Sequence, residues 1–387
     1  METIGVIVGT TEIAWKSILI VLAVLAWFFI SYALYAAHGG GRLCMWLFLL
    51  PSVALSALLS RLLYWYCNQE QYASFAAALT EISPEGFAMA GILPGIFIIA
   101  GVLRLLRISK SLRGMLDALA PGTALGMGLL YLTCLFDARC RGKVIVTAQV
   151  FQHLPFSAPM AVPQGGVEYR FAVFFVSFLA MLCIAKLCMD FYLARWQERG
   201  CTAALFLMLY AAAGYILDSC RYDAGYFPFN GFVSVLQIFA AFAFLGLAVA
   251  FSVRMIRRRS FRWYMVPLWF ALLGAMGAAG TLEYLVQRYG DRFLLWYGLM
   301  GISCLAIVLL LYLMYALGRP AGAQPEKAEK PAGISPDITD AAAKKPSGPA
   351  ETEEKNPLAL PAGLAAFSAV LAALGLGALL VSKKDRE

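Results

Sequence analysis

The chain has little charge and very little histidine. Of its 387 residues, 14% are charged and two are histidine, whereas 61% are hydrophobic. A composition so poor in charge excludes an ordinary soluble globular protein. The nine cysteines show no paired spacing of the kind that holds zinc, so neither a metal nor another cofactor is expected.

Long apolar runs recur along the chain instead. Each has about 17 to 25 residues, which is enough for a helix to cross the hydrocarbon core of a bilayer. Backbone groups in lipid must be paired within each helix, so the sequence predicts an all-α integral membrane protein. The predicted membrane segments are residues 14–37, 44–66, 86–103, 114–136, 171–189, 201–217, 231–253, 263–281, 293–317 and 358–381.

The charges in the loops predict the orientation of the chain. Residues 104–113 and 254–262 are rich in basic residues and contain no acid, and such loops stay on the cytoplasmic side. Residues 67–85 contain three glutamates and no basic residue, so we expect them outside, together with the N-terminus. The net charge of +8 then belongs mostly to inner loops that meet anionic headgroups, and no nucleic-acid partner is predicted.

The C-terminal part changes character. Residues 319–357 are rich in Pro, Ala, Lys and Glu and predict a disordered linker, because they cannot bury enough apolar surface to fold. Residues 358–387 are an apolar segment with a basic tail and predict a tail anchor. Their Leu-Pro start resembles a cell-wall sorting signal but lacks the Thr-Gly that sortases read. Ten membrane spans would place the basic tail outside, although basic segments usually stay on the cytoplasmic side. Either one of the last three segments does not cross the membrane, or the few charges of the tail are too weak to determine its side.

The stretch GYILDSCRYDAGYFP, residues 214–228, ends a membrane segment with an acid and a base. Asp218 and Arg221 are three residues apart, so both can lie on one face of a helix. One interpretation is an ion pair at the headgroup level, with Arg221 reaching lipid phosphates. The other is a site that holds a lipid at the outer end of the bundle. The residues alone leave both interpretations open.

One region, residues 86–136, resembles the prolipoprotein diacylglyceryl transferases. It contains an apolar helix and a basic loop, followed by Asp117, Pro121, Gly126 and Gly128 at the spacings of that family. The order and the spacing of these features carry the resemblance.

The resemblance extends beyond this region. Arg61, in LLSRLLYWY, matches a family arginine that precedes aromatic residues. Residues 210–223 resemble the family's Tyr-Gly-x-x-Arg-x-x-x-Glu-x-x-Arg helix, and SVLQ, residues 234–237, resembles the start of its last helix. Together the matches cover about residues 10–256.

The resemblance implies a fold, a reaction and a location. Members of the family move diacylglycerol from phosphatidylglycerol to the lipobox cysteine of a lipoprotein precursor in the bacterial plasma membrane. We therefore expect residues 1–256 to form a seven-helix transferase-like domain and residues 257–318 to form an additional helix pair. An anionic phospholipid, phosphatidylglycerol, is the expected partner, and lipoprotein precursors are a second candidate.

Several signature positions of the family hold different residues in this chain. The signature arginine, first asparagine and glutamate match Tyr131, Cys134 and Arg139, and the essential arginine of the sixth helix matches Gly214. These replacements remove the polar groups that the resemblance would otherwise assign to catalysis.

The family's histidine falls in the segment GFAMAGI, where neither Ala88 nor Met89 can accept a proton. Residues that act as a unit lose most of their rate enhancement when one of them is removed. We therefore predict a non-catalytic binder of lipid or lipoprotein. The alternative is a divergent but active diacylglyceryl transferase with rebuilt catalysis.

The surviving charges define the candidate lipid site. We predict that Arg221 binds a lipid phosphate, with Arg139 or Arg61 as the second cation, because the planar guanidinium offers phosphate two hydrogen bonds. Asp218, which matches a family glutamate, is expected to orient Arg221 rather than touch the lipid.

Any retained catalysis needs a base that forms the thiolate of the acceptor cysteine. His153, in a long outer loop, and Asp137, near the outer end of its helix, are the candidates. A disulfide between Cys140 and Cys220 is also a candidate, because both are expected on the oxidising side of the membrane.

Overall fold

The computed structural model describes residues 4–8, 11–80, 86–162, 166–194, 198–228, 231, 233–289 and 292–319. Within this part of the chain, eight helices are long and apolar enough to cross a membrane. The predicted all-helical, multi-pass membrane fold is therefore confirmed. The C-terminal segment and all but the first residue of the linker lie outside the described residues.

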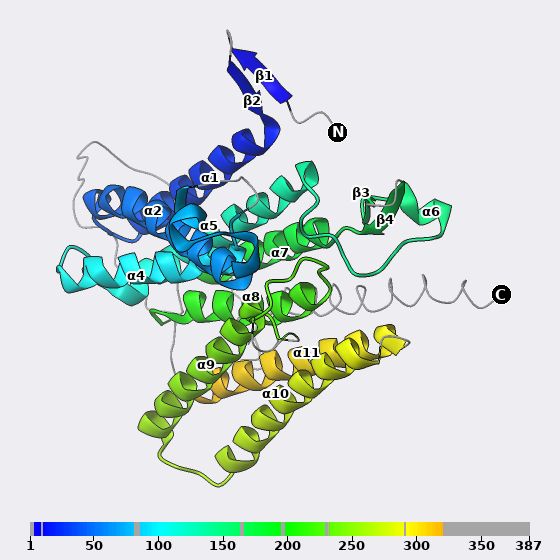
Figure 1. Cartoon of the computed structure of the whole chain (residues 1–387). Helices are drawn as coiled ribbons and strands as arrows, with labels where there is room; N and C mark the ends of the chain where they lie inside the picture. The colour runs from blue at the N-terminus through cyan, green and yellow to red at the C-terminus, as the bar shows by residue number, and fades with distance from the viewer. Residues whose placement is uncertain are drawn as a thin grey trace, which may run out of the picture.

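These eight helices and the shorter α4 follow the predicted segments closely (Figure 1). They are α1 (Trp15–Ala37), α2 (Arg42–Cys67), α4 (Ile92–Leu105), α5 (Leu112–Leu132), α7 (Val173–Leu193), α8 (Cys201–Ser219), α9 (Val235–Arg259), α10 (Met265–Arg288) and α11 (Phe293–Leu317). Helix α4, in the third predicted segment, is the shortest with 14 residues, because the 3₁₀ turn η2 (Met89–Gly91) takes up the start of that segment.

Short elements lie outside these helices. They are the 3₁₀ turns η1 (Gln69–Gln71) and η3 (Thr133–Phe136), the helices α3 (Phe75–Thr80) and α6 (Gln149–Gln152), and the antiparallel hairpins β1 (Ile4–Val8) with β2 (Thr11–Ala14) and β3 (Ser157–Ala161) with β4 (Val167–Phe171). The sequence analysis did not predict the hairpins, because strands of four or five residues give a weak pattern beside long apolar helices.

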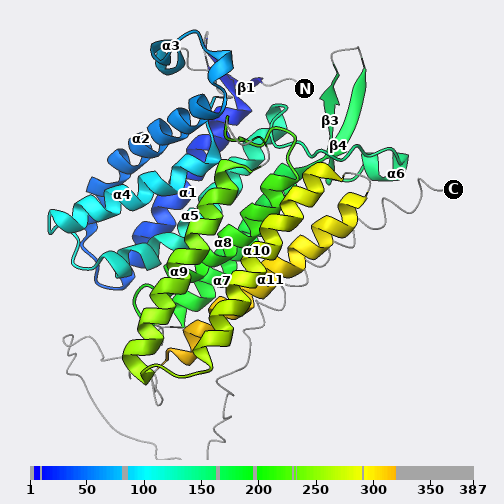
Figure 2. The same ribbon diagram turned by 60° about the horizontal axis from the view of Figure 1, so that its bottom comes forward.

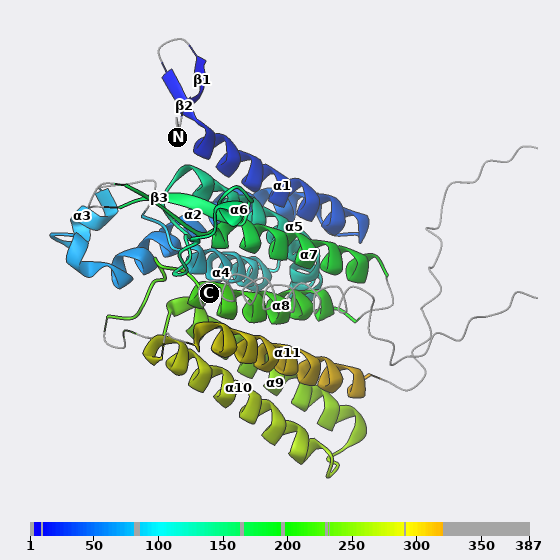
Figure 3. The ribbon, with the colours of Figure 1, turned by 90° about the vertical axis from the view of Figure 1, so that its right-hand side faces the viewer.

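The bundle is built around α5, α7 and α8 (Figure 2). Helix α1 packs on α5, and α2 packs on α4 at one side of the molecule. At the other side α10 and α11 pack on each other, and α11 also packs on α8 and α9 (Figures 2 and 3). Helices α10 and α11, the last two in the described part of the chain, thus pack as a pair against the rest of the bundle.

Small residues let α1 and α5 approach closely. A Cβ atom at Gly122 would lie 2.8 Å from the carbonyl oxygen of Trp27, and one at Gly126 would lie 2.9 Å from the Cβ of the same tryptophan. Membrane helices use small residues in this way, because close backbone approach maximises van der Waals contact. Trp27 Nε1 also donates to Thr123 Oγ1 at 3.2 Å.

Two of the family-like motifs serve as helix caps. Asp117 of α5 accepts hydrogen bonds from the backbone N–H groups of Gly200 and Ala203, so its carboxylate caps the start of α8. Ser234 and Gln237 form a reciprocal capping box at the start of α9, with N–O distances of 3.2 and 2.9 Å. Both motifs therefore stabilise the bundle.

The two basic loops lie at the same end of the bundle. Arg254 and Arg258 at the end of α9 pair with Glu198, just before α8. The α5 end that follows the loop 104–113 lies there too, because Asp117 contacts Gly200. We call this the Glu198 end, and the opposite end, where α1 begins, the Lys16 end.

Candidate lipid site

A cavity of about 310 Å³ opens between α1, α2, α4 and α5. This volume is at the lower end of the range for small-molecule sites, about 300–1,000 Å³. Most of the wall is apolar, with Trp27, Phe87 and Met127 among its large side chains. Lys16 and Arg139 supply the two charges, and no acid or histidine is among the lining residues of the described chain.

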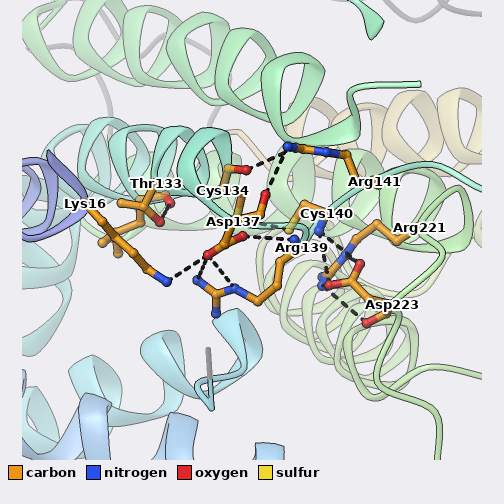
Figure 4. Close-up of polar contacts among 10 residues, drawn as sticks. Lys16, Thr133, Cys134, Asp137, Arg139, Cys140, Arg141, Arg221 and Asp223 are labelled. Carbon is orange, nitrogen blue, oxygen red and sulfur yellow. Dashed lines mark hydrogen bonds and ion pairs between the residues drawn. The ribbon is translucent and has the colours of Figure 1, made fainter. Parts of the chain in front are cut away.

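The two cations converge on one carboxylate. Lys16 Nζ lies 2.8 Å from Asp137 Oδ2, and Arg139 Nε and Nη2 each lie 2.9 Å from the same oxygen (Figure 4). The backbone N–H of Arg139 also donates to Asp137 Oδ1 at 2.9 Å. We call these three residues the cationic end of the cavity, because two positive charges and one negative charge leave a net charge of +1.

The Asp137 carboxylate is ionised and fully engaged. Burial raises its pKa, but the hydrogen bonds from Arg139 and Lys16 outweigh burial and hold the pKa below its ordinary value. Only 4% of the Asp137 side chain is exposed, against 12% of Lys16. A carboxylate of low pKa with two cationic partners is a poor base, and this geometry suits it to positioning Lys16 and Arg139.

Arg221 lies on the side of the Asp137–Arg139 loop that is opposite to Lys16 (Figure 4). Its Nη1 is 2.9 Å from Asp218 Oδ1, and its Nη2 is 3.0 Å from Asp223 Oδ2. Two carboxylates around one guanidinium give this position a net charge of −1, which disfavours an anionic ligand. Asp223, which the sequence analysis did not single out, is therefore a main partner of Arg221.

The space beside Arg221 is small. It is a void of about 10 Å³, lined by Tyr131, Gly214, Asp218 and Arg221 among others. Such a volume corresponds to about one water molecule. This void beside Arg221 is therefore too small for a lipid headgroup.

A family model of prolipoprotein diacylglyceryl transferase matches residues 3–254. The chain belongs to this family. A search of curated proteins found no match. The match ends within α9, so α10 and α11 lie beyond the part that the transferase family model covers.

The transferase signature positions fall into two places in the structure. Ala88 and Met89, which match the family's histidine segment, line the cavity, as does Arg139. Tyr131 and Gly214, which match family arginines, line the small void beside Arg221 instead. Helix α5 contributes residues to both places, Met127 to the cavity and Tyr131 to the void.

Arg61 has a different environment from Arg139. Its side chain is buried, and its Nε and Nη1 donate to the carbonyl oxygens of Ala78 and Gly86 at 2.7 and 2.9 Å. The guanidinium also lies 5.2 Å from the ring centre of Tyr72. These contacts fix the segments on both sides of residues 81–85 against α2. Of the three arginines that the sequence grouped at one phosphate, only Arg139 lines the cavity.

His153 lies at the end of α6 with an exposed side chain, and it is not among the residues that line the cavity. The other histidine, His38, contacts the carbonyl oxygen of Leu34 and packs on Tyr192 at the end of α1. Within the described part of the chain, no group of three His, Cys, Asp or Glu side chains is arranged to hold a metal ion.

The sequence analysis missed Lys16 at this site. A lysine at the start of an apolar helix has the ordinary pattern of a headgroup-level residue, and its partner is 121 residues away. Asp223 carried a local signal, because it follows Arg221 by two residues in the sequence RYD.

Proposed function

We propose that this member of the transferase family binds an anionic phospholipid, phosphatidylglycerol, in the cavity between α1, α2, α4 and α5. The phosphate lies at the cationic end, against Lys16 and Arg139, and acyl chain lies along the apolar wall. The chain holds the lipid without transferring its diacylglyceryl group. The proposal places it in the bacterial plasma membrane, where lipoprotein precursors are a second class of partner.

The observation that carries this proposal is the polarity of the cavity. An apolar wall with two cations at one end matches the two parts of an anionic lipid, and Lys16 and Arg139 exceed Asp137 by one charge. Arginine and phosphate form charge-assisted hydrogen bonds, which are about twice as strong as neutral ones. The positive charge therefore has a ligand of suitable chemistry.

The absence of a base from the cavity wall supports the non-catalytic part of the proposal. Transfer to a cysteine thiol requires a group that removes the thiol proton. Among the described residues that line the cavity there is no acid and no histidine, and Asp137 is already paired with Lys16 and Arg139. The cavity thus has groups that can bind an anionic lipid, but it has no group that can remove the thiol proton.

The distribution of charge supports the proposed orientation. The two basic loops, residues 104–113 and 254–262, lie at the Glu198 end, and basic loops stay on the cytoplasmic side. The Lys16 end then faces outward, which places the N-terminus and the cationic end at the outer leaflet.

Lipid retention tests the binding proposal. Native mass spectrometry of the detergent-purified protein measures how much phosphatidylglycerol remains bound to wild type, Lys16→Ala and Arg139→Ala. A charged hydrogen bond contributes about 1.5–3 kcal/mol, so each variant is expected to retain phosphatidylglycerol about tenfold less well or worse. Lys186→Ala is the matched control, because Lys186 pairs with Asp190 on α7 and does not line the cavity. Equal retention by all four proteins would exclude the cavity as the binding site.

A transfer assay tests the remaining part. Purified protein is incubated with phosphatidylglycerol and a lipobox peptide, and the peptide mass is followed. We expect no thiol-dependent gain of a diacylglyceryl group above background. Clear turnover would establish the alternative, a divergent active transferase, and would leave the binding result unaffected.

A further inference from the structure

Two cysteines face each other beside the cationic end of the cavity. The sulfur atoms of Cys134 and Cys140 are 3.4 Å apart, and both residues are buried. They are the first and last residues of a segment, residues 134–140, that we call the cysteine loop. This loop carries Asp137 and Arg139, so the sulfur pair lies across the base of the segment that forms the cationic end (Figure 4).

Hydrogen bonds already hold the cysteine loop in a closed form. Arg141 Nη1 donates to the carbonyl oxygen of Cys134, and its Nη2 donates to that of Asp137, both at 3.0 Å. The backbone N–H of Cys140 donates to both carboxylate oxygens of Asp223, at 3.0 and 3.1 Å. These contacts fix the backbone on either side of the loop, so the two sulfurs meet without a rearrangement of the fold.

We infer that Cys134 and Cys140 form a disulfide that closes the cysteine loop. A disulfide bond is about 2.05 Å long, so the sulfurs must approach by about 1.4 Å from their 3.4 Å contact. The inference rests on the proposed orientation, because disulfides persist on the oxidising side of a membrane. Cys140 has Cys134 as its sulfur contact here, in place of the pairing with Cys220 that the sequence left open.

The reaction is a thiol–disulfide exchange with a disulfide-bearing oxidoreductase of the outer compartment. The thiolate of one cysteine attacks the oxidoreductase disulfide and forms a mixed disulfide, with release of one oxidoreductase thiolate. The second cysteine, as thiolate, displaces the other oxidoreductase sulfur and completes the bond between Cys134 and Cys140. The two cysteines lose two protons and two electrons, and the oxidoreductase is reduced to its dithiol. Because both side chains are buried in the folded protein, the exchange takes place before the loop has packed.

The disulfide would hold Asp137 and Arg139 in a closed ring. Without it, the loop is held by the hydrogen bonds of Arg141 and by the contact of Cys140 with Asp223. Reduction therefore loosens the segment that places Arg139 at the cavity, while the membrane helices stay in place.

Trypsin provides a direct test, because it cleaves between the two cysteines after Arg139 and again after Arg141. Cells are lysed in N-ethylmaleimide, and the full-length protein is purified and digested without reductant. The expected product is the peptide 114–139 linked to the dipeptide 140–141, which separates on reduction. Maleimide on both Cys134 and Cys140 in the unreduced digest would overturn the inference, as would linkage of the dipeptide to peptide 200–221, which contains Cys220.

Thermal unfolding gives a second measurement. Reductant is expected to lower the midpoint of the wild type by a few degrees, because a disulfide restricts the unfolded chain. Cys134→Ser and Cys140→Ser should start at the lower value and show no further effect of reductant. Cys183→Ser, in α7, is the control and should behave as the wild type. A reductant effect that persists in both loop variants would contradict the assignment. Loss of lipid binding by the cavity variants is a separate result and does not bear on this linkage.

Discussion

Neutralising Asp137 should make the stability of the protein depend on anionic lipid. In the wild type, Lys16 and Arg139 share this carboxylate at 2.8 and 2.9 Å. Asp137→Asn keeps the size of the side chain but removes its charge, so two cations then face each other at the end of the cavity. A bound phosphate can replace the missing negative charge, whereas water replaces it poorly.

The magnitude follows from the contacts. The asparagine oxygen can still accept from one cation, so about one strong charged hydrogen bond and part of a second are lost. At about 1.5–3 kcal/mol each, the loss is about 2–4 kcal/mol in the lipid-free protein. In a domain of 150–250 residues such a loss lowers the unfolding midpoint by roughly 4–16 °C, and the shift is smaller in a larger protein such as this one. The phosphate then meets a net charge of +2 instead of +1, and about tenfold tighter binding corresponds to about 1.4 kcal/mol.

The assay is thermal unfolding in detergent, with and without short-chain phosphatidylglycerol. Asp137→Asn should have a lower midpoint than wild type without lipid and a larger rise on addition of lipid, because ligand that binds only the folded state stabilises it by mass action. Phosphatidylcholine, which has no net charge, should give no such difference between the two proteins.

Glu198→Gln is the matched control. Glu198 also bridges two cations, Arg254 and Arg258, but at the opposite end of the bundle and away from the cavity. This variant should lose stability without any gain in the response to phosphatidylglycerol. An equal gain in both variants would show that the lipid acts on exposed charge in general, and the reasoning about the cavity would be refuted.

Three further predictions concern the surroundings of the site. The pKa of Asp137 is below its ordinary value of about 3.9. The stability that this carboxylate contributes is therefore complete above about pH 3.9 and is lost as the pH falls through the lower pKa of the folded protein. In a plot of unfolding midpoint against pH, the decrease at acid pH should be shallower for Asp137→Asn than for the wild type. Arg221→Ala leaves Asp218 and Asp223 without their cation and should cost about 3 kcal/mol or more in denaturant unfolding, while native mass spectrometry shows phosphatidylglycerol retention within about twofold of wild type. Ser234→Ala removes the capping box of α9 and should cost about 1 kcal/mol in the same unfolding assay, without any change in bound lipid.

The membrane segments could be predicted from the sequence because hydropathy and length are local properties. The predicted segment 14–37 became α1 at Trp15–Ala37, and the segment 201–217 became α8 at Cys201–Ser219. The start of α9 near Ser234 was also indicated, because SVLQ resembles the start of the family's last helix, and the capping partner Gln237 is three residues away. Features whose parts lie within one helical turn can thus be predicted from a single sequence.

The site could be predicted only in part, because it depends on contacts between distant segments. The sequence analysis named Arg139 and Asp137 separately, but their common partner Lys16 lies on α1, far away in the chain. It placed Arg221 at the lipid, whereas backbone pairing between Gly142 and Arg221 holds that arginine beside the cysteine loop. The spacing of residues in the sequence predicts which of them share one face of a helix, but it does not predict which other helix that face contacts.

The distance between Lys16 and Asp137 in the sequence also determines when the cationic end can form during synthesis of the chain. The two residues are 121 positions apart, and translation adds about 5–20 residues per second, so Lys16 is made roughly 6–24 s before its partner. During that interval, α1 can enter the membrane while its lysine is solvated by water and headgroups. The cationic end is completed only when the segment after α5 arrives. A nascent chain that ends before residue 137 lacks both Asp137 and Arg139, so it has no finished place for a phosphate.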